Sequence, residues 1–265
     1  MIHHSHDPAP RRRLRVMTYN IHHGRGIDRR YDLERIANVI DHERPHIVAL
    51  QEIEQFSKRT RSDNQPEILA RCLNMDYVFT RVMDHRHTGD KRGSGFGLAI
   101  LSRLPIKAHE HFDLSYRNAR EPRACLHTTL SAGETPLHVF CVHLGLPYRE
   151  RLFQVERLLS NDIVNNGKFG NGPKILLGDF NNWWPVSSAR LINKCFHNAC
   201  QVTGRKRLRT FGKFFNFLCL DYIFASHDLK IMSCHTLTTR LARVASDHRP
   251  VVCSVQISTQ RSTHP

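Results

Sequence analysis

The sequence predicts a single, sheet-rich α/β domain whose sheets are mixed or antiparallel. Short apolar runs of strand length recur along the whole chain, whereas only four segments show helical spacing. No linker rich in Pro, Gly or Ser divides the 265 residues. Several strand-like runs follow one another without a helix between them, which favours antiparallel pairing over a regular βαβ winding.

In the first half of the chain, strand-like runs alternate with two helical segments. "YDLERIANVIDHE" carries apolar residues at helical spacing from Leu33 to Ile40, and Pro45 stops the helix before the next strand. "PEILARCLN" predicts a second, shorter helix. The predicted helices cover 31–43 and 66–74, and the predicted strands cover 14–21, 46–53, 76–83 and 95–102.

The second half is richer in strands. "RERLFQVERLLSNDIV" places Leu152, Val155 and Leu158 on one face of a helix, and "KILLGDFNN" predicts a buried strand that ends at Asp179. The predicted helices cover 149–164 and about 186–196, and the further strands cover 123–131, 137–145, 220–226, 230–237 and 249–257.

The charge of the chain indicates a polyanionic partner. Lys and Arg together number 39 against 24 Asp and Glu, which gives a net charge of +15. Such an excess favours nucleic acid, or an anionic lipid surface, over a neutral partner. No apolar run approaches the roughly 18 residues of a membrane-spanning helix.

The cysteines and the two ends of the chain set further expectations. The eight cysteines lack Cys-x-x-Cys and zinc spacings, and several lie inside apolar runs, so we expect buried free thiols and a cytoplasmic location. The N-terminus lacks the apolar stretch of a secretory signal. We expect a flexible basic, His-rich arm over 1–13, the domain over 14–258, a tail over 259–265, and a monomer.

Polar side chains collect where the predicted strands begin or end. A buried ionised carboxylate such as that of Asp179 needs a partner. Strand ends on one edge of a sheet converge in space, and hard cations such as Mg²⁺ take oxygen ligands there together with a phosphate. The residues at these positions are Asn20, Glu52, His143, Asp179, Asp221, Asp247 and His248.

Other catalytic patterns are absent from the sequence. There is no G-x-S-x-G elbow for acyl chemistry and no G-x-x-x-x-G-K-[ST] phosphate loop. "GSGFG" over 93–97 precedes a strand rather than a helix, so it indicates a turn.

In this order, the motifs resemble those of the endonuclease/exonuclease/phosphatase superfamily of DNase I-like, metal-dependent phosphodiesterases. The blocks that carry the resemblance are "TYNIHHG", "IVALQEI", "GLAILSRLPI", "REPRA", "CVHLG", "LLGDFNN", "LDYIFAS" and "SDHRPVV". The resemblance implies a four-layer αββα sandwich, in which helices flank two packed mixed sheets, and one bound Mg²⁺ or Mn²⁺ ion.

The resemblance also implies roles for individual residues. Glu52 would be the principal metal ligand, helped by Asn20 and Asp247. Asp179 would orient or deprotonate the attacking water, and Asn181 would hold the phosphate. His248, oriented by Asp221, and His143 would contact the scissile phosphate or assist the leaving group. Arg123 would contact a phosphate.

Two features separate the chain from particular branches of the superfamily. His22 stands where several abasic-site nucleases have an acid, so we expect one ion and place His22 at the substrate phosphate. The region "FLCLDYIF" lacks the signature of inositol phosphatases. The likeness extends to small uncharacterised bacterial members and leaves the substrate open.

Two loops bear on the substrate. "GRKRLRTFGKFFNF" over 204–217 mixes basic residues with Phe, which suits nucleic acid by charge and stacking, or an anionic membrane by insertion of Phe214 and Phe215. The loop over 84–95 adds basic charge, and Trp183 and Trp184 serve as a brace under the site or as a stacking ledge. We expect a nuclease acting on DNA or RNA; the alternatives are a phospholipid or sphingolipid phosphodiesterase, and a binding module without catalysis.

Overall fold

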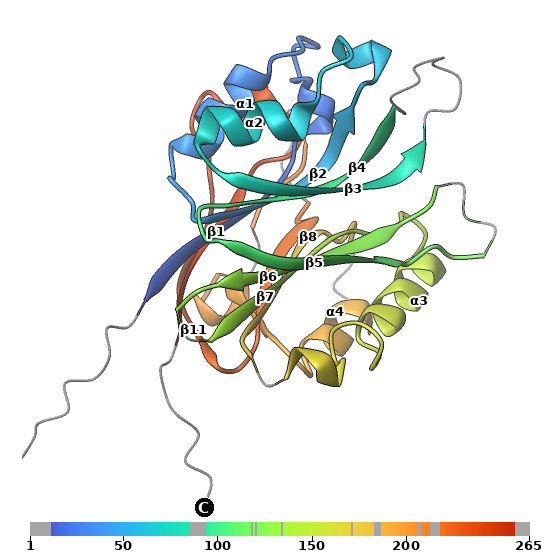
Figure 1. Cartoon of the computed structure of the whole chain (residues 1–265), viewed down its shortest axis with the longest axis vertical. Coiled ribbons are helices and arrows are strands. Elements are labelled where there is room, and N and C mark those ends of the chain that lie inside the picture. Colours follow the sequence, from blue (N-terminus) through green and yellow to red (C-terminus); the bar gives the residue numbers. More distant parts are fainter. Residues whose placement is uncertain are drawn as a thin grey trace, which may run out of the picture.

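The computed structural model describes residues 12–84, 94–117, 119, 121–133, 135–170, 172–182, 187–205, 208–212 and 218–257. Within this part, the strands form two six-stranded sheets, of order β11-β12-β1-β2-β4-β3 and β5-β6-β7-β8-β10-β9. The sheets lie face to face, with α1 and α2 over one outer face and α3 and α4 over the other (Figure 1). The predicted four-layer sandwich is confirmed.

The first sheet carries the N-terminal helices. Asp32 caps α1 by accepting a 2.8 Å hydrogen bond from the backbone nitrogen of Arg35, and the predicted apolar stripe of α1 is buried. The elements of this half are β1 (Arg13–Asn20), η1 (His22–Gly24), α1 (Leu33–Asp41), β2 (Ile47–Gln55), η2 (Lys58–Thr60), α2 (Gln65–Leu73), β3 (Asp76–Asp84), β4 (Gly95–Ser102), β11 (Leu229–Thr236), α6 (Ala242–Ala245) and β12 (Val251–Ile257).

The second sheet is built from the middle of the chain. Its elements are β5 (Ile106–Asp113), β6 (Ala124–Ser131), β7 (Pro136–His143), α3 (Tyr148–Leu158), η3 (Gly167–Phe169), β8 (Lys174–Asp179), α4 (Ser187–Ile192), β9 (His197–Asn198), α5 (Ala199–Val202) and β10 (Asp221–Ala225). The sequence did not predict β5, β9, the three 3-10 helices, α5 or α6. β5, "IKAHEHFD", is an edge strand whose side chains are mostly exposed, so it lacks the apolar pattern of a buried strand.

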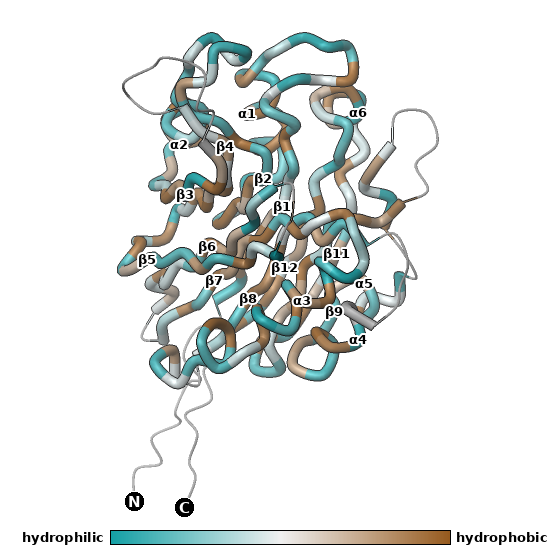
Figure 2. The backbone as a smooth tube through the Cα atoms, turned by 90° about the vertical axis from the view of Figure 1, so that its right-hand side faces the viewer, coloured by the Kyte–Doolittle hydropathy of each residue, from teal (hydrophilic) through white to brown (hydrophobic). Residues whose placement is uncertain are grey.

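Three apolar clusters hold the layers together. One fills the space between the sheets and includes Val16, Ala49, Cys141 and Leu177. A second joins the first sheet to α1 and α2, and a third joins the second sheet to α3 and α4. Figure 2 shows the hydrophobic segments gathered in the strands, with hydrophilic segments around them. This burial is what stabilises the sandwich.

The central strands of both sheets bring their polar ends to one edge. β1 and β2 are parallel and place Asn20 opposite Gln51. β7 and β8 are parallel and place His143 opposite Asp179, while β10 runs antiparallel and starts with Asp221 opposite Asp179. The convergence expected from the sequence therefore follows from the topology.

The structure also bears on the expectations for the ends and the cysteines. β1 begins at Arg13, one residue inside the predicted arm, and residues 1–11 and 258–265 lie outside the described residues. The cysteines are free; six are buried as expected, Cys195 is half-buried and Cys72 is exposed. Among the described residues, no helix has both the length and the apolar character needed to cross a bilayer.

A buried histidine pair lies in the second sheet, away from the converging strand ends. His127 Nε2 and His138 Nδ1 are 3.1 Å apart, and the His127 ring packs on Phe140 and Phe169 at centroid distances of 4.6 and 4.3 Å. Burial, helped by His138 and Lys168, lowers the pKa of His127 from 6.5 to about 3. The folded protein therefore holds this ring neutral.

Replacing His127 by Phe keeps a ring in the cluster and removes the titrating group. Because the folded-state pKa lies below the unfolded one, acid protonates the unfolded chain first, and stability falls as the pH drops below about 6.5. At about pH 5 this costs the wild type about 2 kcal/mol. We expect the loss of unfolding free energy between about pH 8 and pH 5 to be smaller by that amount in His127→Phe, as measured by urea denaturation; an equal loss in both proteins would contradict this.

Candidate active site

A cleft of about 510 Å³ opens at the edge where the strand ends converge. Eight of the ten predicted site residues line it: His22, Glu52, Arg123, His143, Asp179, Asn181, Asp247 and His248. The other two, Asn20 and Asp221, lie directly behind and hydrogen-bond to residues that line it. The structure thus brings together all ten.

Asp179 lies at the centre of this arrangement and is almost fully buried. One carboxylate oxygen accepts a 2.9 Å hydrogen bond from the Asn181 backbone, and the other accepts one of 3.1 Å from Asn20 Nδ2. The Nε2 atoms of His143 and His248 each lie 3.6 Å from that second oxygen. Burial raises the pKa of Asp179 to about 7, against the opposing attraction of His248.

Gly178 allows the strand to deliver Asp179 to this position. Its φ is +149°, and a Cβ atom there would lie 2.0 Å from the Val142 carbonyl oxygen on β7. No side chain fits such a close approach, so the glycine before the acid is a requirement of the β7–β8 pairing.

A β-bulge turns Glu52 into the cleft. Leu50 and Ile53 both pack on the side of β2 that faces the helices, although strict alternation would put residues three apart on opposite sides. The register of β2 against β4 shifts between Gln51 and Ile53, and Glu52, the extra residue, has a φ of +54°. A bulge of this kind re-aims a side chain beside a functional site.

Asn20 orients two carboxylates at once. Its amide nitrogen donates to Glu52 Oε1 at 3.0 Å and to Asp179 Oδ2 at 3.1 Å, while its amide oxygen accepts the backbone N–H of His22 at 3.1 Å. The His22 hydrogen bond fixes which end of the amide faces the acids. In this geometry Asn20 presents its amide nitrogen to both carboxylates; its predicted place at the metal stays a prediction.

His248 and Asp221 form a buried pair. His248 Nδ1 donates to Asp221 Oδ2 at 2.9 Å, which leaves Nε2 facing Asp179. Burial opposes a charge on the ring, but the carboxylates of Asp221, Asp179 and Asp247 outweigh it and raise the pKa of His248 to about 10. His248 is therefore an imidazolium at neutral pH.

His143, in contrast to His248, is neutral at neutral pH. It ends β7 and lies deep in the cleft wall. Burial, with added repulsion from Arg123, His248 and His23, lowers the pKa of His143 well below its ordinary value. The two imidazoles that face Asp179 thus differ in charge, because only His248 has a second carboxylate behind it.

The remaining predicted residues occupy the rim and the floor. Asn181, with a φ of +48°, donates its side-chain nitrogen to the Leu144 carbonyl at 2.8 Å. Arg123 donates to Glu121 at 2.8 Å from the cleft wall. His22 Nδ1 lies 3.8 Å from Asp247 Oδ1. Trp183, Trp184, Phe214 and Phe215 lie outside the described residues, as does most of the loop over 84–95.

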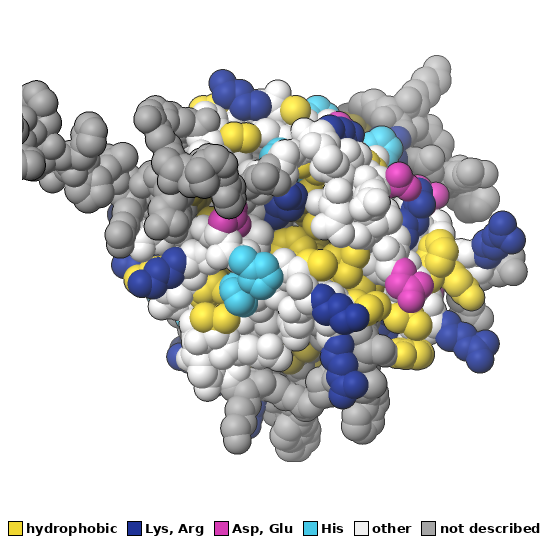
Figure 3. All heavy atoms as spheres, turned by 90° about the horizontal axis from the view of Figure 1, so that it is seen from below, with side chains coloured by type: hydrophobic (Ala, Val, Ile, Leu, Met, Phe, Trp, Pro, Cys, Tyr) yellow, Lys and Arg dark blue, Asp and Glu magenta, His cyan; other side chains and the backbone are white. Residues whose placement is uncertain are grey.

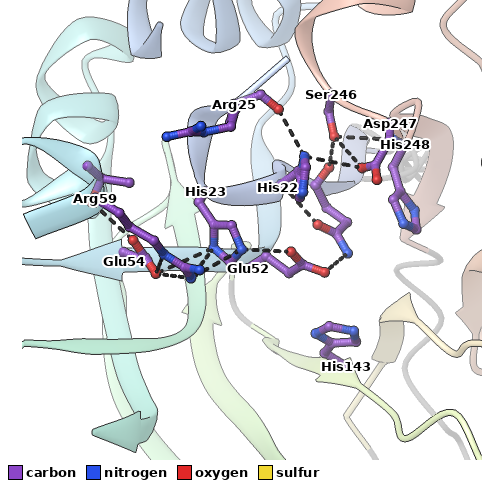
Figure 4. A network of polar contacts seen from close by, with 12 residues as sticks. His22, His23, Arg25, Glu52, Glu54, Arg59, His143, Ser246, Asp247 and His248 are labelled. Atoms are coloured by element: carbon purple, nitrogen blue, oxygen red, sulfur yellow. Dashed lines mark hydrogen bonds and ion pairs between the residues drawn. The ribbon is translucent and has the colours of Figure 1, made fainter. Parts of the chain in front are cut away.

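Sequence reasoning missed three residues of the cleft region: His23, Glu54 and Arg59. His23 Nε2 lies 3.4 Å from Glu52 Oε2, and its Nδ1 lies 3.5 Å from Glu54 Oε1. Arg59 pairs with Glu54 through its Nε at 2.8 Å. Figure 4 shows the His23 ring between Glu52 on one side and the Glu54–Arg59 pair on the other. The doublet "HH" was the available signal, but it does not tell which ring points inward.

The donor groups suit a divalent cation. Ligand atoms of His22, His23 and Glu52 lie within 4.8 Å of one another, as do those of Asp179, Asp221 and His248. In the second group His248 is cationic and already bonded to Asp221. The first group includes Glu52, whose carboxylate lines the same cleft as that of Asp247. Carboxylate oxygens and imidazole nitrogens are ordinary ligands of Mg²⁺, Mn²⁺ and related ions.

The chain is similar to a known protein family and to an uncharacterised bacterial protein. The model of the Endonuclease/Exonuclease/phosphatase family matches residues 17–248. The Escherichia coli K12 protein "Uncharacterized protein YbhP" is 30% identical over 261 residues, which cover 92% of this chain and 96% of that protein.

Two solved structures share the fold. An endonuclease/exonuclease/phosphatase from Beutenbergia cavernae has a TM-score of 0.75 at 24% identity and covers 94% of this chain and 72% of its own. The Bacteroides thetaiotaomicron mannosyl-6-phosphatase Bt3783 has a TM-score of 0.69 at 22% identity, over 91% and 99% of the two chains.

Replacing Asp221 by Asn removes the carboxylate that supports the His248 charge. We expect the pKa of His248, which stands at about 10, to fall by at least about one unit. Asp247→Asn is the matched control, because Asp247 makes a smaller contribution to the same pKa and should lower it less. The measurement is a pH titration of the imidazole signals by NMR. A larger fall in Asp247→Asn than in Asp221→Asn would contradict the assignment.

Proposed function

We propose that this chain, which belongs to the endonuclease/exonuclease/phosphatase family, is a divalent-metal-dependent phosphodiester hydrolase that acts on nucleic acid. The observation that carries the proposal is the convergence of Glu52, Asp179, Asp247 and two imidazoles of opposite charge state on one cleft. Phosphodiester cleavage needs an activated water, neutralised phosphate oxygens and help for the leaving alkoxide.

The acidic side of the cleft would hold the cation. Glu52, aimed by its bulge and fixed by Asn20, and Asp247 would bind one Mg²⁺ or Mn²⁺ ion. When bound, the ion neutralises charge on the phosphate and polarises it toward attack. Asn20 also holds Glu52 and Asp179 at a fixed separation, so the ion site and the base keep a constant geometry.

Asp179 would act on the attacking water. Its pKa of about 7 suits a group that accepts a proton near neutral pH. The Asn181 backbone holds one of its oxygens, so Asp179 presents a defined lone pair to the cleft. Asn181 lines the same cleft and would contact the phosphate.

His248 and His143 would have different roles at the phosphate. The cationic His248 would hold the negative oxygens and stabilise charge that grows in the transition state, with Asp221 keeping its ring protonated and oriented. The neutral His143 can donate one hydrogen bond to the phosphate or to the leaving oxygen. Arg123 and His22 also line the cleft and would contact further phosphate oxygens.

The preference for nucleic acid comes from charge. The net charge of +15 attracts any polyanion, and Arg59 and Arg123 line the cleft itself. On the face shown in Figure 3, Lys and Arg side chains are spread among apolar, acidic and histidine side chains, so the preference for nucleic acid depends on the net charge and on the arginines of the cleft. The lipid alternative depends on Phe214 and Phe215, which the structure does not describe. A monomeric state and a cytoplasmic location also remain predictions.

Replacing Glu52 by Gln should lower metal-dependent turnover of a generic phosphodiester by about a hundredfold or more, because it removes a charge that binds the cation. Glu52 is partly exposed and bears no structural ion pair with Arg or Lys among the described contacts, so the unfolding free energy should stay within about 0.5 kcal/mol. Glu156→Gln, on the exposed face of α3, is the matched control. Full activity in Glu52→Gln, or activity of the wild type in EDTA, would rule out the metal assignment.

A side-by-side assay of the full chain decides the substrate class. With Mg²⁺ or Mn²⁺, we expect hydrolysis of plasmid DNA or RNA, and a substrate affinity that falls steeply with salt because bound phosphates release counterions. Anionic phospholipid vesicles and a sugar 6-phosphate are the comparison substrates, the latter because one fold neighbour is a mannosyl-6-phosphatase. Turnover of vesicles or of the sugar phosphate alone would overturn the choice of nucleic acid.

A further inference from the structure

Exposed apolar and aromatic side chains gather beside the cleft, around the first turns of α3. Among the described residues, seven large apolar side chains are exposed, and four of them lie here: Tyr116, Leu146, Tyr148 and Phe153. Leu146, which is 58% exposed, also lines the cleft. Single exposed apolar residues are ordinary on a protein surface, whereas a group of them marks a surface that contacts a ligand or a partner.

Tyr116 and Phe153 form a ring pair on this surface. Their centroids lie 5.4 Å apart at an interplanar angle of 62°, and each residue is 38% exposed. The side of α3 that packs on the second sheet carries Val155 and Leu158, so Phe153 stands on the solvent side of the helix. Burial of such rings in a core would be favourable. Their exposure leaves aromatic faces open to a planar ligand.

Arginines flank the ring pair. Arg149, Phe153 and Arg157 follow one another at four-residue spacing, which places them on one face of α3, and both arginines are exposed. Arg157 Nε also donates to the Asp113 carbonyl at 2.8 Å, which ties this face of the helix to the end of β5. The exposed carboxylates of Asp113 and Glu156 offset part of the positive charge. The rings therefore have to supply much of any binding here.

The ring pair is continuous with the cleft. Leu114, two residues before Tyr116, donates its backbone N–H to the Arg123 carbonyl at 2.8 Å, and the Arg123 N–H donates to Ser115 Oγ at 3.2 Å. Arg123 lines the cleft, as does Leu146 just before α3. Figure 1 shows α3 on the outer face of the second sheet. Both segments that carry the rings therefore start at the cleft wall.

We propose that Tyr116 and Phe153 bind unpaired bases of the substrate, and that the protein therefore prefers single-stranded to double-stranded nucleic acid. The proposal rests on the nuclease function proposed above and narrows its substrate. Bases of a single strand can turn their faces to aromatic rings, whereas the faces in a duplex are covered by neighbouring bases. The arginines beside the rings would meet the phosphates between those bases.

An anionic membrane is the other partner that aromatic and basic side chains suit. The rings here alternate with arginines along one helix face, which fits bases between phosphates better than it fits insertion of one continuous apolar face. The two partners also differ in what they need from Phe153. Insertion into a bilayer uses apolar area, which leucine also supplies, whereas base stacking uses the aromatic face.

The test measures binding of the full chain to a labelled single strand of about 15 nucleotides and to the matching duplex. Fluorescence anisotropy is recorded in EDTA, so that no strand is cleaved. In Phe153→Ala we expect single-strand affinity to fall about 10-fold and duplex affinity to change less than about twofold. Tyr116→Ala should behave in the same way. Phe153→Trp should keep the wild-type affinity, and Phe153→Leu should lose it.

A phosphate contact gives a second readout. In Arg149→Gln, the slope of log affinity against log salt for the single strand should become shallower by about 0.7, because one phosphate contact is lost. Met232→Ala is the matched control, since it removes an exposed apolar side chain from β11, in the other sheet. It should change neither affinity nor slope.

The outcomes separate the two proposals. Unchanged single-strand affinity in a folded Phe153→Ala or Phe153→Leu protein, or equal wild-type affinity for strand and duplex, would overturn base binding and leave the hydrolase standing. Binding of anionic phospholipid vesicles in place of single strands, reduced in Phe153→Ala and kept in Phe153→Leu, would overturn it in favour of a membrane surface. Absence of metal-dependent turnover of a small generic phosphodiester by the wild type would instead overturn the proposed function, on which the anisotropy measurement does not depend.

Discussion

The arrangement of the cleft depends on one contact between the two sheets: the Asn20 amide on β1 donates to the Asp179 carboxylate on β8. A carboxylate with 1% of its surface exposed cannot stay ionised without compensation. Asn20, the Asn181 backbone and the His248 cation provide it, and each comes from a different strand end. Because the groups that compensate this buried acid come from both sheets, the sheets have to pack so that these groups meet at Asp179. The same packing forms the cleft.

Local environment, rather than residue type, sets what each group in the cleft can do. His143 and His248 lie at the same 3.6 Å from Asp179, yet one is neutral and the other charged, because only His248 has Asp221 at its far nitrogen. Asp179 differs again, because burial raises the pKa of its carboxyl group to about 7, where it can take a proton near neutral pH. Separated proton affinities of this kind are what acid–base catalysis needs.

Most of the strands, and the polar residues at their ends, could be predicted from the sequence. Apolar runs in β1, β2, β7 and β8 mark buried strands, and a polar residue straight after such a run marks its end. Segments that depart from the pattern of apolar runs could not be predicted from the sequence. β5 has no apolar alternation because it is an exposed edge, and the bulge at Glu52 leaves no mark in "IVALQEIEQ". His23, Glu54 and Arg59 were missed because their meeting depends on a left-handed turn that only the fold imposes.

Residues with strained backbone conformations line the cleft. Glu52, Asn181, His22 and His23 all have positive φ without being glycine, and each costs stability that a less strained residue would recover. All four line the cleft, whereas the positive φ of Arg44 and Asn74 lies at ordinary connections after α1 and α2. Four strained positions around one cleft fit a site that holds its ligand atoms in place before the ligand arrives.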